Sequence, residues 1–345
     1  MVDASELAFR DLCRKYGAQL AYTPMLHSAS FVRDAKYRAE HFTTHALDRP
    51  LVAQFCANEP ATFVNAAKLV QNRVDAVDLN LGCPQGIARR GCYGAFLMDH
   101  LQLVRALVSA AAAELAVPVW VKIRVFDDVK ATVEYARMLE EAGASLIAVH
   151  GRTREQKGRQ CPPADWDKIR AVVKAVNVPV IANGNVRTKA DANRAMQYTG
   201  AEGVMSAYAL LDYPAVFGGV KLSRMQLAYE YINLAERRNT PLRMVRLHLF
   251  KLFRSRLDAN MDLNEAVAKC RCFEDFRQVA DTLSKRCDFE GVSFEQRIER
   301  GEKLDNVVSA KRIERLKRKQ LLESNQAVDA QSGPLGTSVA VNTPT

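Results

Sequence analysis

The chain has 345 residues, 48% of them hydrophobic and 26% charged, with a formal net charge of +10, a composition typical of a globular protein with one large core or two unequal ones. Its longest apolar runs fall far short of the ~20 residues of a membrane helix, and its first residues lack the pattern of a secretory leader, so we expect no membrane partner and a cytoplasmic location. The eight cysteines are scattered without a C-x-x-C pair, which argues against a disulfide framework and against a zinc or other metal site.

The chain opens with a helical pattern over residues 3–16, where Leu7, Phe9, Leu12 and Cys13 supply the apolar positions. We interpret this segment as the first helix of a barrel. No strand pattern precedes it, so we expect either an open barrel or a first strand upstream of Met1.

Seven short apolar or β-branched runs follow, at the spacing of one βα unit each. They cover residues 18–22, 51–55, 74–80, 118–123, 145–149, 178–182 and 203–206. Each run is too apolar to face water on one side, which favours a parallel sheet covered by helices. The sequence thus predicts an α/β fold, a (β/α)8 TIM barrel whose first strand is missing from this chain.

Helical patterns lie between these runs, for example over residues 63–70 and 166–176. Thr188, followed by Asp191 three residues later, has the pattern of a helix N-cap. Gly143 and Gly200 lie where two of the helices should end, just before the next strand.

Strand patterns end at residues 218–219, and charged amphipathic segments follow over about residues 221–238, 242–256, 263–287 and 293–322. We therefore expect a barrel domain over 1–220, an all-helical domain over 221–323 and a disordered tail over 324–345, where large apolar residues are scarce. Basic residues outnumber acidic ones by 23 to 16 in residues 221–323, against 26 to 22 in residues 1–220. This excess favours a nucleic-acid partner, although charged helix faces are often merely solvated.

Polar residues end the predicted strands. Because the active sites of (β/α)8 barrels lie at the carboxyl ends of the strands, we expect these residues on one rim. They are Gln54, residues 80–83, Lys122 with Arg124, His150 with Arg152, residues 183–185, and Ser206 with Ala207. A single Lys or His at a strand end is usually structural, but six such positions on one rim favour a binding site.

Five segments make the prediction specific, and they read YTPMLHSASFVRD, DLNLGCPQGIARRGCYGAFLM, VKIRVF, VHGRTREQKG and IANGNV. In this order they resemble the motifs of the tRNA-dihydrouridine synthases, FMN-dependent enzymes that use NADPH or NADH to reduce the C5–C6 bond of uridines in tRNA. The likeness is greatest to the eukaryotic type that acts on positions 16 and 17. It covers about residues 1–217 well and the helical region only in kind, and NLGCPQ is its most specific element.

The resemblance implies a set of FMN contacts, namely Met1, Val2, Gln54, Lys122, His150, Asn183, Gly184, Asn185, Ala207 and Tyr208. Lys122 would place a positive charge beside the N1–C2 edge of the flavin, and Gln54 would hydrogen-bond the pyrimidine-like end of its ring. His150 suits either the flavin phosphate or the uracil. Gly184 would let backbone amides approach the phosphate closely.

The resemblance also makes Cys83 the catalytic acid. Hydride transfer to uracil C6 leaves C5 to take up a proton from the opposite face, and a thiol is still protonated at neutral pH. The alternative for a cysteine is a small hydrophobic role, which we expect of Cys92. The expected substrate contacts are Asn80, Arg89, Arg90, Arg124 and Arg152, and residues 86–94 are expected to be a mobile loop whose arginines meet tRNA phosphates.

Two positions depart from the family pattern. The first-strand motif of the family ends in Ala-Pro-Met-Val, of which this chain has Met1 and Val2. After the last strand, Ser206-Ala207-Tyr208-Ala209 replaces Ser-Ala-Glu-Gly, and Ala209 lacks the freedom of glycine at positive φ.

The family analogy places tRNA between the helical domain and the barrel mouth, and we expect a monomer. The basic run over residues 311–319 would serve such binding, but it also suits a solvated face or a nuclear-import signal, so a nuclear location beside the cytoplasmic one stays open. Two rival functions remain. One is an FMN barrel reductase of a small pyrimidine or an enone, which leaves the basic helical domain unexplained. The other is a tRNA-binding protein that has lost flavin and catalysis.

Overall fold

The computed structural model describes residues 3–158, 161–219 and 221–286. Met1 and Val2, the helix expected over 293–322 with its basic run, and the tail expected over 324–345 lie outside the described residues. The described residues belong to one compact unit, which contains both the sheet and the described helices of the C-terminal region. The boundary expected near residue 220 stays a prediction.

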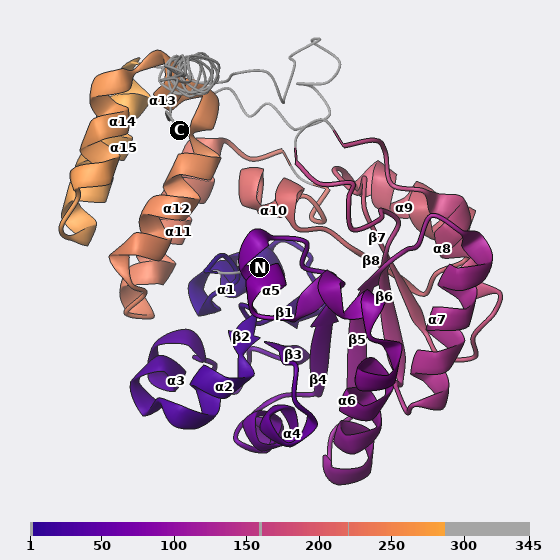
Figure 1. Ribbon diagram of the computed structural model, residues 1–345. Coiled ribbons are helices and arrows are strands. Elements are labelled where there is room, and N and C mark those ends of the chain that lie inside the picture. The colour runs from indigo at the N-terminus through magenta and orange to yellow at the C-terminus, as the bar shows by residue number, and fades with distance from the viewer. Residues whose placement is uncertain (1–2, 159–160, 220, 287–345) are drawn as a thin grey trace, which may run out of the picture. The chain divides into compact units, whose positions relative to one another are not determined.

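The strands form one parallel sheet in the order β1-β3-β4-β5-β6-β7-β8, with β2 also paired to β3 (Figure 1). Their bounds are β1 Ala21–Tyr22, β2 Leu26–His27, β3 Leu51–Cys56, β4 Ala76–Leu81, β5 Val119–Arg124, β6 Leu146–His150, β7 Val180–Asn183 and β8 Gly203–Met205. Since β1 and β2 pair with successive parts of β3, they occupy a single strand position, and all seven predicted strands are present. Within the described part of the chain, no pairing joins β8 to β1.

Helices follow the strands along the chain and surround the curled sheet (Figure 1). They are α1 Leu7–Lys15, α2 Ser28–Arg33, α3 Ala35–His41, α4 Pro60–Lys68, α5 Gly86–Arg90, α6 Leu101–Glu114, α7 Val129–Glu141, α8 Trp166–Val173, α9 Lys189–Thr199 and α10 Tyr208–Asp212, with 3-10 helices η1 Gln71–Arg73 and η2 Gly94–Asp99. Thr188 and Asp191 form the predicted cap of α9, in which each side chain accepts from the other's backbone. The predicted TIM-barrel-type architecture with a helical C-terminal region is confirmed.

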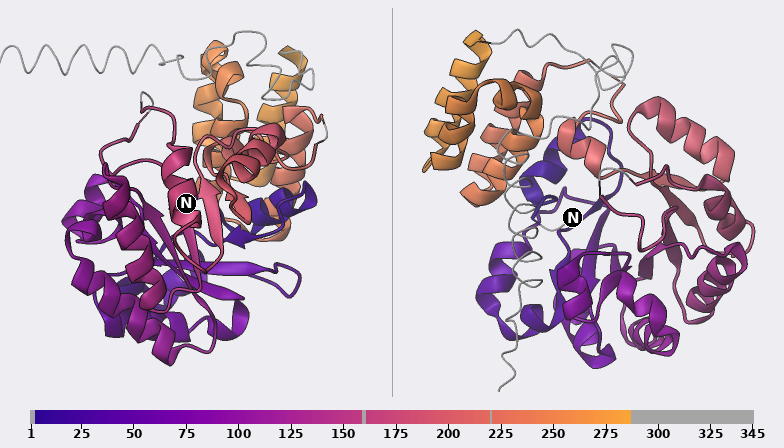
Figure 2. Two further views of the ribbon diagram at one scale, coloured as in Figure 1. Left: turned by 90° about the vertical axis from the view of Figure 1, so that its right-hand side faces the viewer. Right: turned by 45° about the horizontal axis from the view of Figure 1, so that its top comes forward.

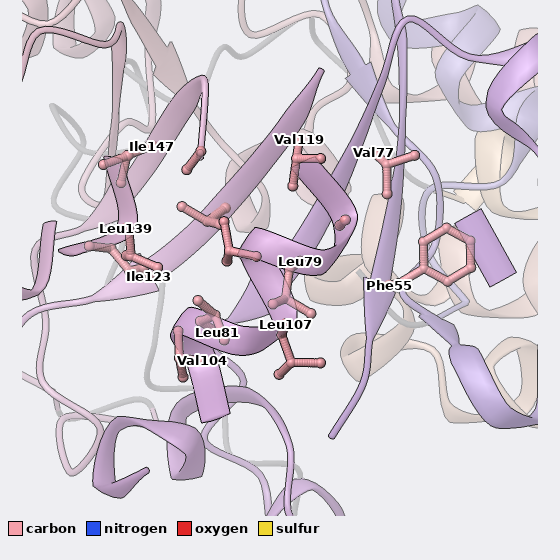
Figure 3. Close-up of a cluster of buried hydrophobic side chains, with 14 of the residues drawn as sticks. Phe55, Val77, Leu79, Leu81, Val104, Leu107, Val119, Ile123, Leu139 and Ile147 are labelled. Atoms are coloured by element: carbon pink, nitrogen blue, oxygen red, sulfur yellow. The ribbon is translucent and has the colours of Figure 1, made fainter. Parts of the chain in front are cut away.

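Alternation along the strands separates two environments. On β4, Val77, Leu79 and Leu81 pack outward into the core beneath the helices, where Leu107 of α6 meets them (Figure 3). The residues between them, such as Asp78, therefore point to the inside of the curled sheet. This alternation puts polar side chains inside the sheet without interrupting its apolar outer face.

The C-terminal region contains α11 Arg224–Arg237, α12 Leu242–Leu252, α13 Arg254–Ala259, α14 Met261–Lys269 and α15 Phe273–Arg286. The amphipathic segments expected over 242–256 and 263–287 are helical, and each is divided into two helices. In the second case the backbone is not helical at Cys270, with ψ 133°, and Asp275 accepts from the N–H groups of Arg271 and Cys272 at the start of α15. The hydrogen bonds of Asp275 cap the start of α15, so a new helix begins here although the amphipathic pattern of the sequence is continuous.

Helix α1 packs against α11 and shares the hydrophobic core of the C-terminal helices, which form a group of their own in Figure 2. Its Glu6 accepts from Tyr231 Oη at 2.7 Å and pairs with His248 Nε2 at 2.9 Å, all three side chains being buried. We expected α1 to act as a barrel helix only. Helix α1 also connects the sheet to the C-terminal helices.

Among the described residues, no helix is long and apolar enough to cross a membrane.

Candidate active site

The predicted strand-end residues meet at the carboxyl edge of the curled sheet, as the register of the strands requires. Asn80 lies beside Lys122, Arg124 beside His150, and His150 beside Asn183 on neighbouring strands. All face inward, because they alternate with the apolar residues of the outer core. The rim inferred from the sequence is therefore one surface rather than six separate positions.

A buried chain of hydrogen bonds lies at the floor of this surface. Gln54 Nε2 donates to Asp78 Oδ2 at 2.9 Å, and Asn80 Nδ2 donates to Gln54 Oε1 at 3.0 Å. Asn80 Oδ1 accepts from the backbone N–H groups of Gly82 and Cys83 at 3.1 and 2.9 Å. Both predicted contact residues, Gln54 and Asn80, thus belong to one network.

Sequence reasoning missed Asp78, which is completely buried in the middle of β4. Burial raises the pKa of its carboxyl to about 7, although the Gln54 hydrogen bond and the Lys122 charge act in the opposite direction. The sequence VDLNL at residues 77–81 could have revealed it. An acidic residue at an inward-facing position of a buried strand needs polar partners.

Backbone contacts hold the Cys83 segment from both sides. Arg124 Nε donates to the Gly82 carbonyl at 2.8 Å, and the Ala95 N–H donates to the Cys83 carbonyl at 3.0 Å. Gly94 has φ +66°, and a Cβ there would lie 2.8 Å from the Cys83 carbonyl oxygen, so a larger residue would displace the segment. Cys83 itself is half-buried, which leaves its side chain partly accessible.

The stretch over residues 86–94, expected to be a mobile loop, is helical in part, because residues Gly86–Arg90 form the short helix α5. Arg89 and Arg90 are exposed on this helix, and neither has a hydrogen-bond or ion-pair partner among the described residues. Cys92 was expected to be a small buried hydrophobic residue, and this is wrong, because it is exposed after α5, where its φ is 51°. The two arginines therefore present free positive charge close to Cys83.

Lys122 is half-buried on β5 and makes no hydrogen bond or ion pair within the described ranges. Burial and the Arg124 charge lower the pKa of its ammonium to about 8, while Asp78 acts in the opposite direction. An ammonium without a partner at this depth is costly, so the position suits the binding of an anionic or polar ligand.

Arg124 is buried, and its guanidinium donates to backbone carbonyls of two loops. Besides Gly82, it reaches the carbonyls of Thr153 and Gln156 through Nη1 at 2.7 and 3.1 Å. The structure thus places Arg124 as a support of the Cys83 segment, and its predicted contact with substrate stays a prediction.

Arg152 is similarly engaged. It donates to the Pro162 carbonyl at 2.8 Å, to His150 Nε2 at 3.2 Å and to Asn185 Oδ1 at 2.7 Å. Burial, followed by the charges of Lys122, Arg124 and Arg152, lowers the pKa of the His150 imidazole to about 2. His150 is therefore neutral, and Arg152 holds its orientation.

The turn after β7 lies against this histidine. Gly184 has φ +114°, and a Cβ there would lie 2.5 Å from the Ala164 Cβ and 3.0 Å from His150 Cδ2. Asn183 donates through Nδ2 to the Met205 carbonyl at 2.8 Å, which fixes β8 beside β7. Asn185 follows in the left-handed region with φ 60°.

After β8 the chain enters α10 directly. Ala207 precedes the helix with φ −126°, and Ala209 is a buried helical residue, so the expected need for positive φ at Ala209 does not arise. Tyr208 is exposed and accepts a hydrogen bond from Arg254 of α13, whose guanidinium also lies 5.4 Å from the centre of its ring. Tyr208 thus connects the rim to the C-terminal helices, and its predicted cofactor contact stays a prediction.

Several comparisons with known proteins agree with this geometry. The profile described as dihydrouridine synthase (Dus) matches residues 1–288. The chain belongs to the dihydrouridine synthase family. Within the described ranges, no cluster of His, Cys, Asp and Glu is placed to hold a metal ion.

Individual relatives agree with this assignment. A Rattus norvegicus protein named tRNA-dihydrouridine(16/17) synthase-like is 50% identical over 289 residues, which are 83% of this chain and 66% of that protein. The tRNA-dihydrouridine(16/17) synthase of Schizosaccharomyces pombe is 41% identical over 315 residues, or 84% of this chain and 78% of the relative. A Homo sapiens tRNA-dihydrouridine(20a/20b) synthase-like protein is 38% identical over 252 residues, 72% of this chain and 78% of the relative. The names of all three include NAD(P)+, and the chain spans slightly less than two thirds of the rat protein.

Proposed function

We propose that the chain reduces uridine to 5,6-dihydrouridine in the D-loop of tRNA, with FMN as cofactor and NADPH or NADH as reductant. The position of Cys83 carries the proposal. Its side chain is half-buried at the mouth of the sheet, its segment is held by Asn80 and Arg124, and the unpaired Lys122 lies on the strand beside Asn80. The relatives that bear this activity in their names support it.

The residues at the mouth fit a flavin. Lys122 offers an ammonium that no described residue satisfies, and Gln54 offers amide groups at the floor. Gly184 lets the turn after β7 pack directly against Ala164 and His150, because a Cβ there would collide with both. The residues that would hold FMN are Gln54, Lys122, His150, Asn183, Gly184, Asn185, Ala207 and Tyr208, with Met1 and Val2 beyond the described part of the chain. Bound FMN would supply the two electrons, as a hydride, for saturation of the C5–C6 bond.

The protein's own groups would supply the proton and the orientation. Cys83 would give its thiol proton to uracil C5, so that C6 gains a hydride, C5 gains a proton and the thiolate recovers its proton from solvent. Neutral His150 would bind either the cofactor phosphate or the uracil with the ring nitrogen that Arg152 leaves free. Arg124 would keep the Cys83 segment in place through the Gly82 carbonyl.

The partner we propose is tRNA, and it would be bound in part by phosphate contacts of Arg89 and Arg90. We propose a monomer that needs no metal, located in the cytoplasm and with nuclear import left open by the basic run over 311–319. An enzyme for a small pyrimidine or enone would not need these exposed arginines.

The test combines three measurements on the purified full chain. The first is the absorbance spectrum, in which flavin bands are expected. The second is dihydrouridine formation in unmodified tRNA with NADPH, measured by mass spectrometry of nucleosides, with free uridine and an enone as competing substrates. The third is tRNA binding as a function of salt. A colourless protein that binds tRNA would instead be a binding protein, and turnover of free uridine or enone but not tRNA would establish a small-molecule reductase.

A further inference from the structure

The hydrogen-bond chain from Asp78 to the Cys83 segment permits one direction only. An ionised carboxylate only accepts, so Gln54 must turn its Nε2 toward Asp78 and its Oε1 toward Asn80. At the other end, the backbone N–H groups of Gly82 and Cys83 only donate, so Asn80 must present Oδ1 to them. The two ends agree, and each amide has a single allowed orientation.

This direction decides what Asn80 can offer a ligand. Its Oδ1 already accepts from two backbone N–H groups, which fills both lone pairs. One hydrogen of its Nδ2 is used by Gln54, and the other is left over. Asn80 is therefore a hydrogen-bond donor toward the mouth, and the matching partner is a carbonyl oxygen, of which uracil has two.

Burial of the Asp78 carboxylate costs free energy that packing alone would not offset. It is completely buried, and its Oδ1 has no hydrogen-bond partner among the described residues. The groups that face it are Gln54 on β3, the charged Lys122 on β5 and the phenol of Tyr22 on β1, whose hydroxyl is likewise unpartnered there. A neutral residue at this position would still accept from Gln54, because the N–H groups of Gly82 and Cys83 fix the direction of the chain, but its hydrogen bond to Gln54 would lose the assistance of the charge.

We propose that Asp78 is a positioning residue for uridine reduction, whose charged hydrogen bond holds Gln54 and, through it, the Asn80 amide that donates toward a uracil carbonyl and supports the Cys83 segment. The proposal rests on the proposed function. The hydrogen bonds that lead from Asp78 to the mouth run through the two amides.

Asp78→Asn is the direct test, because asparagine keeps the size of the side chain and its acceptor oxygen but removes the charge. The measurement is the single-turnover rate of dihydrouridine formation by protein loaded with saturating FMN and reduced with NADPH before tRNA is added. We expect a rate about tenfold lower, because a neutral acceptor replaces a charged one in the hydrogen bond that holds Gln54. The apparent melting temperature and the FMN affinity are recorded alongside the rate.

The matched control is Asp75→Asn, the same substitution next to the start of the strand that contains Asp78. Asp75 lies just before β4, at the opposite end from the mouth, where it accepts from the Leu51 N–H at 2.6 Å and pairs with Arg49 at 2.9 Å. We expect this variant to lower the melting temperature without changing the rate by more than about twofold. A tenfold rate loss in Asp75→Asn would show that any weakening of β4 has this effect, and would overturn the proposal.

A double-mutant cycle with Asn80 separates positioning from general support. If Asp78 acts through Asn80, then Asp78→Asn should cost nothing further in an Asn80→Ala background, within about twofold. If the two losses multiply, Asp78 acts independently of Asn80 and the proposal is wrong. A wild-type protein that forms no dihydrouridine would refute the proposed function instead.

The wild-type protein provides a second measurement should Asp78→Asn not fold. Burial raises the pKa of Asp78 to about 7, so its carboxyl loses its charge, and with it the stronger hydrogen bond to Gln54, as the pH falls through that value. The single-turnover rate should therefore decline on the acid side near pH 7 in the wild type and lose this decline in Asn80→Ala. A flat wild-type profile between pH 6 and 8 would contradict the proposal.

Discussion

Arg152 donates a hydrogen bond from Nη1 to Nε2 of His150, with 3.2 Å between the two nitrogens. Because a guanidinium only donates, Nε2 must be the acceptor, and the single proton of the neutral imidazole lies on Nδ1. The same guanidinium holds Asn185 through Nη2 at 2.7 Å. One arginine thus fixes the tautomer of a histidine and the turn after β7.

Removal of this arginine should loosen the cofactor site. In Arg152→Ala, His150 loses the donor that selects its tautomer and Asn185 loses its partner, so we expect FMN affinity to fall by about tenfold. Flavin fluorescence quenching measures the affinity, and nitrogen-15 NMR of the histidine ring reports the tautomer. Arg170→Ala, which removes an exposed arginine paired with Asp167 on α8, should leave both unchanged.

Loss of the thiol should separate the two half-reactions. Cys83→Ala should retain FMN and NADPH oxidation but reduce dihydrouridine formation by about 10²–10⁴-fold, the range that general acid catalysis contributes. Cys92→Ser, an exchange of an exposed thiol on the same segment, should behave as the wild type. Dihydrouridine formation at the wild-type rate by Cys83→Ala would remove Cys83 from the mechanism.

Loss of the Lys122 charge should act on the flavin. Lys122→Met should weaken FMN binding and slow flavin reduction by NADPH, because the ammonium without a protein partner is no longer present to stabilise the reduced anion. Stopped-flow absorbance of the flavin measures the reduction. Lys130→Met, at an exposed lysine of α7, is the control, and equal flavin content and rate in the two variants would refute the assignment.

The exposed arginines of α5 should govern salt-dependent binding. If Arg89 and Arg90 each contact a phosphate, replacing both with serine should flatten the slope of log affinity against log salt by about 1.4 to 1.8 units. Filter binding of tRNA across a salt series measures the slope, while NADPH oxidation should stay constant. Replacement of Lys130 and Lys174, exposed on the outer helices, is the control, and an unchanged slope in the arginine variant would exclude α5 from the RNA surface.

The buried pair between α1 and α12 should matter for stability. Removal of the Glu6 carboxylate in Glu6→Ala leaves His248 buried without its partner, so we expect a loss of about 3–5 kcal/mol in the free energy of unfolding. Urea denaturation measures it, and Glu274→Ala, at an exposed pair with Arg277, should cost at most ~1 kcal/mol. Although burial opposes it, the His248 charge and the hydrogen bonds lower the pKa of Glu6, so this stabilisation is present above the pKa of an unfolded glutamate and is lost as the pH falls through the lowered value.

Much of this protein follows from the sequence by itself. The apolar runs predict the strands, and their regular alternation with helical segments predicts the parallel order, because a connection that contains a helix returns the chain to a parallel strand. Thr188 with Asp191 predicts the start of α9 for the same reason, since a cap is formed within four residues. The polar strand ends predict the rim, because parallel strands bring their carboxyl ends to one edge.

Only the tertiary structure decided what those polar residues do to one another. In the sequence, Arg124 and Arg152 both look like free cations at strand ends. In the structure, both guanidinium groups donate hydrogen bonds to backbone carbonyls of loops. Asp78 lies in an ordinary apolar run, and its role appears only when β3 brings Gln54 to its side. The reason is physical. A hydrogen bond depends on distance and direction between groups far apart in the chain, and these are set by strand register and packing, which no local pattern of residues records.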